Sequence, residues 1–138
     1  DPEADLGLDA AIVRGLGDWW AMGAVLMDEL VATTPEITAA SIAQLWPEHF
    51  DHACTLTLAG DVKVNVGASP GDGDEPEPYL YVGPWGPDRP GDASYWNAPF
   101  GAVLRRADGT DPLAFLRRGI ELLATARAAP GAGGPAPS

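Results

Sequence analysis

The sequence predicts an α+β domain: an antiparallel sheet of three to four strands, with an N-terminal and a C-terminal helix packed on one face. Apolar residues recur at steps of three and four near both ends of the chain, which is typical of amphipathic helices. The middle of the chain instead alternates apolar and polar residues, as half-buried strands do. Strands grouped between terminal helices favour helices that cover one sheet face.

The first helix is predicted over residues 9–31, after an irregular lead-in of residues 1–8. Asp9 is a suitable N-cap because its side chain can accept a hydrogen bond from the first turn. Gly15, Gly17 and Gly23 each lower helix propensity by about 1 kcal/mol relative to Ala. We therefore expect packing to compensate for them, or another backbone to approach closely. The predicted apolar stripe consists of Ile12, Leu16, Trp19, Gly23, Leu26 and Leu30.

A second, short helix is predicted over residues 35–45. Pro35 suits the first helical position, where its missing N–H costs nothing, and Thr34 would cap it. Pro47 prevents the helix from continuing.

A β-hairpin is predicted over residues 53–69, in the run ACTLTLAGDVKVNVGAS. A two-residue loop at Gly60 and Asp61 would place apolar residues opposite polar ones. A three-residue loop, 59–61, gives one consistent apolar face, which a slip of one residue would destroy. The expected pairs are Leu58 with Val62, Leu56 with Val64 and Cys54 with Val66, and the polar face carries Thr55, Thr57, Lys63 and Asn65.

Two further strands and a helix complete the predicted domain. The strands lie at 79–83 and 101–106, and the helix begins where Asp111 and Pro112 supply an N-cap and a first helical residue. Pro130 ends it. We expect one domain over residues 1–128 and a disordered tail, rich in Gly, Pro and Ala, over 129–138.

The formal net charge of -12 limits the partners. Nucleic acids and anionic membrane surfaces require clustered Lys and Arg, and the sequence has no basic stripe. A basic protein surface fits this charge. Cys54 is the sole cysteine, so no disulfide framework exists, and we expect a cytoplasmic protein without cofactors.

Four short motifs resemble a family of uncharacterised actinobacterial proteins. They are LWPEHFD (45–51), VNVGASPGD (64–72), PEPYLYVGPW (76–85) and WNAPFGA (96–102). Members of that family are longer, with an additional N-terminal portion. The resemblance therefore implies that this chain is the C-terminal part of a longer protein. No activity is known for the family, so the resemblance implies no catalytic role.

Two acidic or histidine-containing segments are candidate metal sites. Neither matches the H-E-x-x-H signature of zinc enzymes or the EF-hand pattern of calcium loops. The alternatives are polar residues that hydrogen-bond a bend before the sheet, and a solvated acidic loop. The candidate ligands are His49, Asp51, His52, Asp72, Asp74 and Glu77.

An aromatic group follows the acidic loop and is the candidate partner surface. Alternation places Tyr79 and Tyr81 on one strand face and Leu80 and Val82 on the other. With the aliphatic face in the core, the tyrosines line either a contact surface or a face covered by another segment or subunit. The candidate surface residues are Tyr79, Tyr81, Trp85, Tyr95, Trp96 and Asn97.

These observations predict a non-catalytic protein-interaction or sheet-completing module that uses the aromatic and acidic surface of residues 69–100. Expected partners are the missing N-terminal region, another subunit (a homodimer included) or a basic protein surface. The alternative is a metal-assisted hydrolase built on His49, Asp51 and His52 with the acidic loop 72–77.

Overall fold

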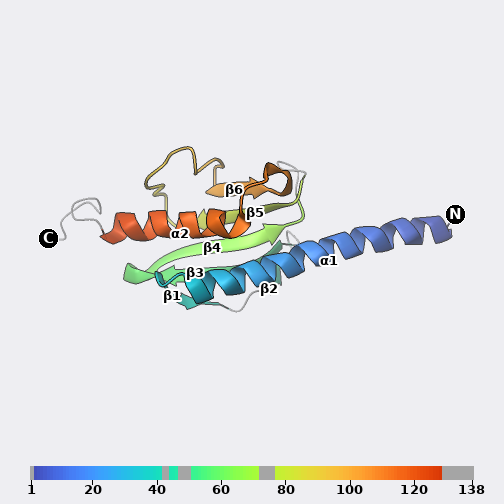
Figure 1. Cartoon of the computed structure of the whole chain (residues 1–138), viewed down its shortest axis with the longest axis horizontal. Helices are drawn as coiled ribbons and strands as arrows, with labels where there is room; N and C mark the ends of the chain where they lie inside the picture. Colours follow the sequence, from blue (N-terminus) through green and yellow to red (C-terminus); the bar gives the residue numbers. More distant parts are fainter. Residues whose placement is uncertain (1, 42–43, 47–50, 72–76, 129–138) are drawn as a thin grey trace.

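The structure, a computed structural model, describes residues 2–41, 44–46, 51–71 and 77–128. It is an α+β fold with one antiparallel sheet in the order β1-β3-β4-β5-β6, and β2 also pairs with β3 (Figure 1). The elements are α1 (Pro2–Thr33), β1 (Ile37–Ala40), β2 (Gln44–Trp46), β3 (Asp51–Leu58), η1 (Ala59–Asp61), β4 (Val62–Ser69), β5 (Tyr79–Pro84), β6 (Ala102–Arg105), η2 (Arg106–Asp108) and α2 (Pro112–Ala128).

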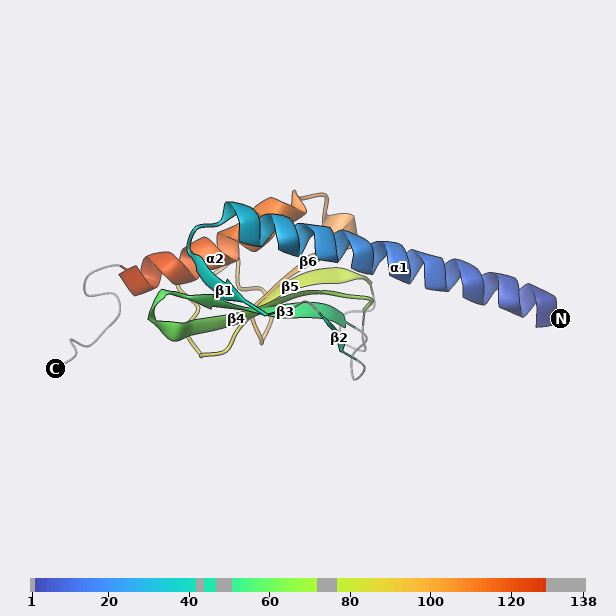
Figure 2. The same cartoon turned by 90° about the horizontal axis from the view of Figure 1, so that it is seen from below.

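Both helices cover the same face of the sheet, as predicted (Figure 2). The core lies between the two layers and is filled by aliphatic residues of β3, β4, β5 and β6 against one stripe of each helix. Leu30 and Ile120 are completely buried in it, one from each helix. The apolar stripe of α1 also includes the buried Met27, and the predicted Leu26 is partly buried against the same core.

The predicted hairpin register is confirmed. Leu58 pairs with Val62, and the ladder continues through Leu56 with Val64 to Cys54 with Val66. The three-residue turn η1 closes it, with Gly60 at φ 78° and Asp61 at φ 61°. Left-handed backbone is favourable for Gly and tolerated by Asp, so this turn suits its residues.

The predicted helix over residues 35–45 is wrong, because this segment forms β1 and β2. Both strands pair with β3, β1 near the hairpin turn and β2 at the other end. The sheet therefore has six strands within the described residues, two more than the largest number predicted. Hydrogen bonds from β3 outweigh the weak helical preference of a short segment.

The first helix begins earlier than predicted, at Pro2 instead of Asp9, so the lead-in of residues 2–8 is helical. The helix packs closely against the sheet. The Trp19 indole donates to the carbonyl of Ser69 at 2.7 Å, and a Cβ at position 23 would lie 2.7 Å from the Cβ of Ala68. The expected close approach at Gly23 is therefore real, and α1 lies directly against β4.

The C-terminal helix begins as predicted. Asp111 Oδ1 accepts the backbone N–H of Leu113 at 3.0 Å, which caps the first turn. Phe115, Leu116, Ile120 and Leu123 face the core. Among the described residues, neither helix has a stretch apolar and long enough to cross a membrane.

Candidate functional site on the open face of the sheet

The face of the sheet opposite the helices carries the side chains that the core does not use. Because side chains alternate between the two faces of a strand, this face carries a group of polar residues and, next to it, a group of aromatic residues. Thr55 pairs with Asn65, Thr57 with Lys63, and Gly67 with Tyr81. We call this surface the open face.

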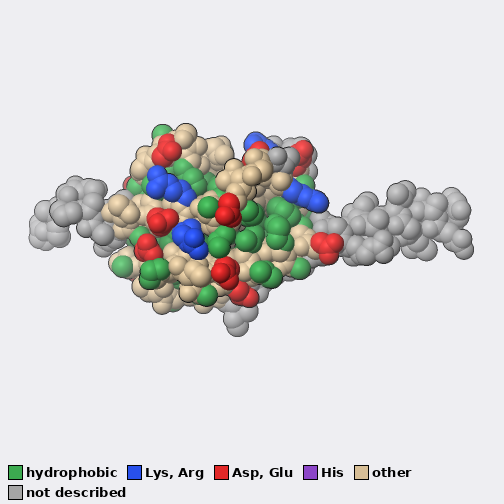
Figure 3. All heavy atoms as spheres, viewed as in Figure 1, with side chains coloured by type: hydrophobic (Ala, Val, Ile, Leu, Met, Phe, Trp, Pro, Cys, Tyr) green, Lys and Arg blue, Asp and Glu red, His purple; other side chains and the backbone are tan. Residues whose placement is uncertain are grey.

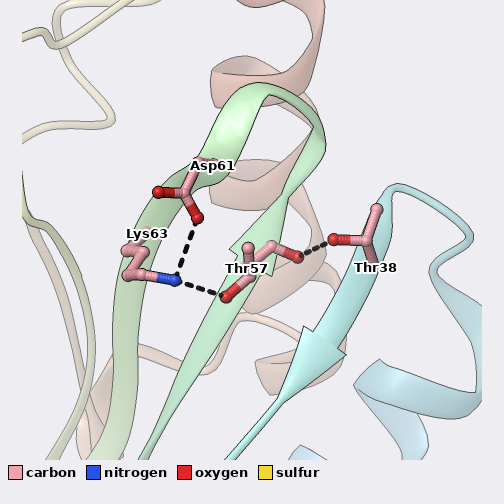
Figure 4. Close-up of polar contacts among 4 residues, drawn as sticks. All are labelled: Thr38, Thr57, Asp61 and Lys63. Atoms are coloured by element: carbon pink, nitrogen blue, oxygen red, sulfur yellow. Dashed lines mark hydrogen bonds and ion pairs between the residues drawn. The ribbon is translucent and has the colours of Figure 1, made fainter.

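A row of polar contacts crosses the open face near the hairpin turn (Figure 4). The Lys63 ammonium donates to the Thr57 hydroxyl at 3.1 Å and forms an ion pair with Asp61 at 3.2 Å. The Thr38 hydroxyl of β1 donates to the Thr57 carbonyl at 3.0 Å. These groups satisfy one another, so this end of the face is polar.

Three aromatic side chains stand beside the polar row, and we call them the aromatic ridge: Tyr81, Trp85 and Phe100. Trp85 is 63% exposed, yet its indole N–H donates to Asn65 Oδ1 at 2.9 Å. Phe100 is 44% exposed and meets the Tyr81 ring edge-on, with centroids 6.0 Å apart. The ridge thus exposes two large rings, and a hydrogen bond holds the more exposed one, Trp85.

Tyr81 links the ridge to a buried carboxylate. Its hydroxyl donates to Asp51 Oδ2, and the other oxygen of Asp51 has no hydrogen-bond partner among the described residues. Burial, and then the hydrogen bond to Asp51, raises the pKa of the Tyr81 phenol above its ordinary value. Gly67 makes room for the ring, because a Cβ there would lie 2.7 Å from the Tyr81 hydroxyl oxygen.

Tyr79 shares the open face with Tyr81, as alternation predicted, but it is only 6% exposed. The two rings lie 6.2 Å apart. Tyr79 is therefore part of the packing beneath the ridge and offers little surface to a partner.

The remaining predicted aromatics lie on the other side of the sheet. The Tyr95 hydroxyl donates to the Phe115 carbonyl of α2 at 2.7 Å, and Trp96 packs against the same core. Arg89 lies over the Trp96 ring, 5.8 Å from its centroid, and donates to the Phe100 carbonyl at 3.2 Å. The expected single aromatic surface is therefore divided. Tyr95 anchors the loop between β5 and β6 to α2, and Trp96 packs beside Tyr95 against the core.

Asn97, another predicted surface residue, completes the edge of the sheet. Its amide donates to the Val103 carbonyl at 3.0 Å, and its oxygen accepts the Val103 N–H at 2.8 Å. Asp108 accepts the N–H of Arg105 at 2.9 Å. These side chains occupy the outward backbone groups of β6, which would otherwise attract another strand.

The candidate metal ligands are not brought together within the described residues. Asp51 and His52 are neighbours on β3, so they point to opposite faces, and Glu77 is exposed. His49, Asp72 and Asp74 lie outside the described residues. In the part of the chain that the structure describes, no group of three His, Cys, Asp or Glu side chains is placed to hold a metal ion.

Two residues that contact the aromatic ridge were not among the predicted site residues. Asn65 was placed on the polar face by alternation, and that signal alone indicates its exposure but not its bond to Trp85. Arg89 lies in a loop with no periodicity, and only the folded path of the chain brings it to Phe100 and Trp96.

Comparison with known proteins adds nothing to this geometry: no protein-family model, curated protein or solved structure matches the chain. The resemblance to an actinobacterial family therefore stays a prediction.

Proposed function

We propose that the chain is a non-catalytic protein-interaction module that binds a basic protein surface through the aromatic ridge. The observation that carries this proposal is Trp85, which is 63% exposed and yet fixed by its bond to Asn65. An exposed large ring is unfavourable in water, and a ring already held in place loses little entropy on binding. Trp is also among the residues that dominate interface energies.

Charge supports a basic partner. The net charge of -12 attracts positively charged surfaces over long range and repels acidic ones. Electrostatic steering of this kind raises association rates, whereas the buried rings supply most of the affinity.

Contact through the face is favoured over completion of the sheet at β6. Asn97 and Asp108 already pair with the outward backbone groups of Val103 and Arg105. An added strand would first have to displace these bonds.

Among the residues that the structure describes, no contact favours the metal-assisted hydrolase. The described candidate Asp51 already accepts the Tyr81 hydroxyl, and its neighbour His52 lies on the opposite face.

Site-specific photo-crosslinking in the cells that naturally make the protein tests the proposal. A photoreactive phenylalanine analogue replaces Phe100 on the ridge, or Val25 on the outer side of α1 as a matched control, because Val25 is also exposed (67%). We expect a defined adduct with a basic protein from position 100 only. The affinity of that purified partner is then measured by calorimetry at two salt concentrations.

Trp85→Ala is expected to weaken this binding by about thirtyfold or more, since a buried Trp anchor contributes about 2 kcal/mol or more. Val25→Ala is expected to leave it unchanged. Equal crosslinking at both positions, or unchanged affinity in Trp85→Ala, would reject the ridge as the binding surface. An affinity insensitive to salt would reject the basic partner.

A further inference from the structure

Polar groups beside the aromatic ridge hold hydrogen-bond donors that no described residue uses. The Asn65 side-chain oxygen accepts both the Trp85 indole N–H and the Thr55 hydroxyl, each at 2.9 Å. These bonds fix the amide, and its NH2 group has no partner among the described residues. Asn65 therefore presents a donor of fixed orientation next to an exposed ring.

Thr57 and Lys63 continue this set of donors toward the hairpin turn. The Thr57 hydroxyl accepts from the Lys63 ammonium at 3.1 Å and keeps its own proton to donate (Figure 4). The ammonium is also paired with Asp61 at 3.2 Å. Because side chains two positions apart share a strand face, these donors and the Asn65 amide lie on the same side of the sheet.

Gly83 leaves room between the rings of the aromatic ridge. Tyr81, Gly83 and Trp85 alternate onto the open face, and the Trp85 N–H extends the ladder past β5 by donating to the Lys63 carbonyl at 3.0 Å. A Cβ at position 83 would lie no closer than 3.8 Å to Phe100, which is ordinary contact. A small apolar group of a ligand can therefore lie over Gly83, with ring surface on either side.

The chemistry of this surface selects a ligand rich in neutral acceptors. Carboxylates of an acidic partner are repelled by the net charge of -12. Backbone carbonyls in helices and sheets already accept hydrogen bonds, whereas those of an extended, unpaired segment are free. A polyproline II segment has free carbonyls, and its prolines bring no N–H that would be left without an acceptor. Its compact rings also pack well on aromatic side chains.

We propose that the basic partner docks on the aromatic ridge through a proline-rich segment in the polyproline II conformation. A proline ring of this segment lies over Gly83, and its carbonyls accept hydrogen bonds from Asn65 and Thr57. A basic residue beside the prolines meets Asp61, which is 83% exposed and directs its second oxygen away from Lys63 (Figure 4). This inference rests on the proposed function and names the part of the partner that the ridge binds.

Fluorescence anisotropy of a labelled peptide of Pro-Pro-Arg repeats, titrated with the purified chain, tests the proposal. We expect saturable binding. A peptide of Gly-Gly-Arg repeats has the same length and charge but no preformed conformation, and we expect it to bind at least about tenfold more weakly. No binding of the proline peptide, or equal affinities of the two peptides, would overturn the proposal.

Two substitutions on the open face test the docking position. Gly83→Val fills the room between the rings with a residue that suits a strand, and we expect it to weaken peptide binding by about tenfold or more. Asn65→Asp keeps the acceptor for Trp85 and Thr55 but removes the NH2 donor. It is expected to weaken binding by about fivefold, although its added charge attracts a basic peptide.

Val25→Glu is the matched control for charge. It adds the same charge on the helix layer, at a side chain that is 67% exposed. Figure 3 shows this side of the molecule, where acidic and basic side chains are interspersed among hydrophobic ones. We expect Val25→Glu to leave peptide binding unchanged.

Circular dichroism and thermal unfolding verify that the variants keep the wild-type fold, and Asn65→Asp alone decides the docking position if Gly83→Val does not. Unchanged peptide affinity in either folded open-face variant would overturn the proposal, and so would an equal loss in Val25→Glu.

Mass spectrometry of the adduct formed at position 100 separates this inference from the proposed function. We expect the crosslinked site of the partner to lie in a proline-rich segment. A site within a folded helix or sheet of a basic partner would overturn the proline-rich segment and leave the proposed function standing. The absence of any adduct at position 100 would reject both.

Discussion

Tyr81 connects the exposed and buried parts of the open face. Its ring meets Phe100 at the surface, lies over Gly67, and directs its hydroxyl to the buried carboxylate of Asp51. Buried carboxylates are costly unless they accept hydrogen bonds from a fixed donor. Tyr81 therefore stabilises both the strand pairing beneath it and the position of the ridge.

Tyr81→Phe is expected to lower the free energy of unfolding by about 1–3 kcal/mol, because it keeps the ring but leaves Asp51 without this donor. Urea unfolding measures the change. A double-mutant cycle with Asp51→Ala, which removes the acceptor, isolates the interaction, and we expect a coupling of at least about 0.5 kcal/mol. Additive effects of the two substitutions would contradict the assigned bond.

At the scale of elements, α1 can pack closely on β4 because position 23 is a glycine and has no side chain. Gly23 lies over Ala68, and one turn earlier the Trp19 indole bonds to the Ser69 carbonyl. The helix-propensity cost of Gly23 is thus offset by closer packing of a whole helix on the sheet.

Gly23→Val is expected to destabilise the fold by about 2 kcal/mol or more, because its side chain would displace α1 from Ala68. Ala21→Val on the exposed side of the same helix is the matched control, and we expect a change of about 0.5 kcal/mol or less. Thermal and urea unfolding measure both. Helix propensity alone would make Gly23→Val neutral or slightly stabilising, because Val is a better helix former than Gly. A variant as stable as the wild type would therefore contradict the close contact with β4.

At the scale of the whole molecule, the two-layer packing removes several ionisable groups from water. Burial, with a smaller effect of Asp28, raises the pKa of the Cys54 thiol from 9.0 to about 11, and its sulfur lies 3.5 Å from the Met27 sulfur. Burial also raises the pKa of Tyr81 and Tyr95. The folded state therefore holds all three groups in their neutral forms.

Stability is expected to fall in alkaline solution. The unfolded chain releases the Cys54 proton near pH 9 and the folded chain near pH 11, so its contribution is complete below pH 9 and is lost as pH rises through 11. Melting temperatures between pH 8 and pH 11 measure the loss. Cys54→Ala is expected to be less stable at pH 8 but to lose less between pH 9 and pH 11. An identical pH dependence in that variant would contradict the assignment.

Local patterns in the sequence determined much of this protein. Period-two alternation defined the hairpin register from Cys54 to Val66 and the shared face of Tyr79 and Tyr81. The Asp-Pro pair defined the start of α2, and the net charge of -12 led to the prediction of a basic partner. Each of these depends on residues within a few positions of one another, or on composition alone.

Only the tertiary structure decided the rest, because it depends on contacts between residues far apart in the chain. Residues 37–40 and 44–46 became strands because β3 offers them backbone partners. The path of the loop before β6 sent Tyr95 and Trp96 to the helix layer and Phe100 to the open face, and it brought Asn97 to the β6 edge. Alternation along a strand predicts which residues share a face. Which segments cover that face depends on contacts between residues far apart in the chain, and a local pattern does not contain that information.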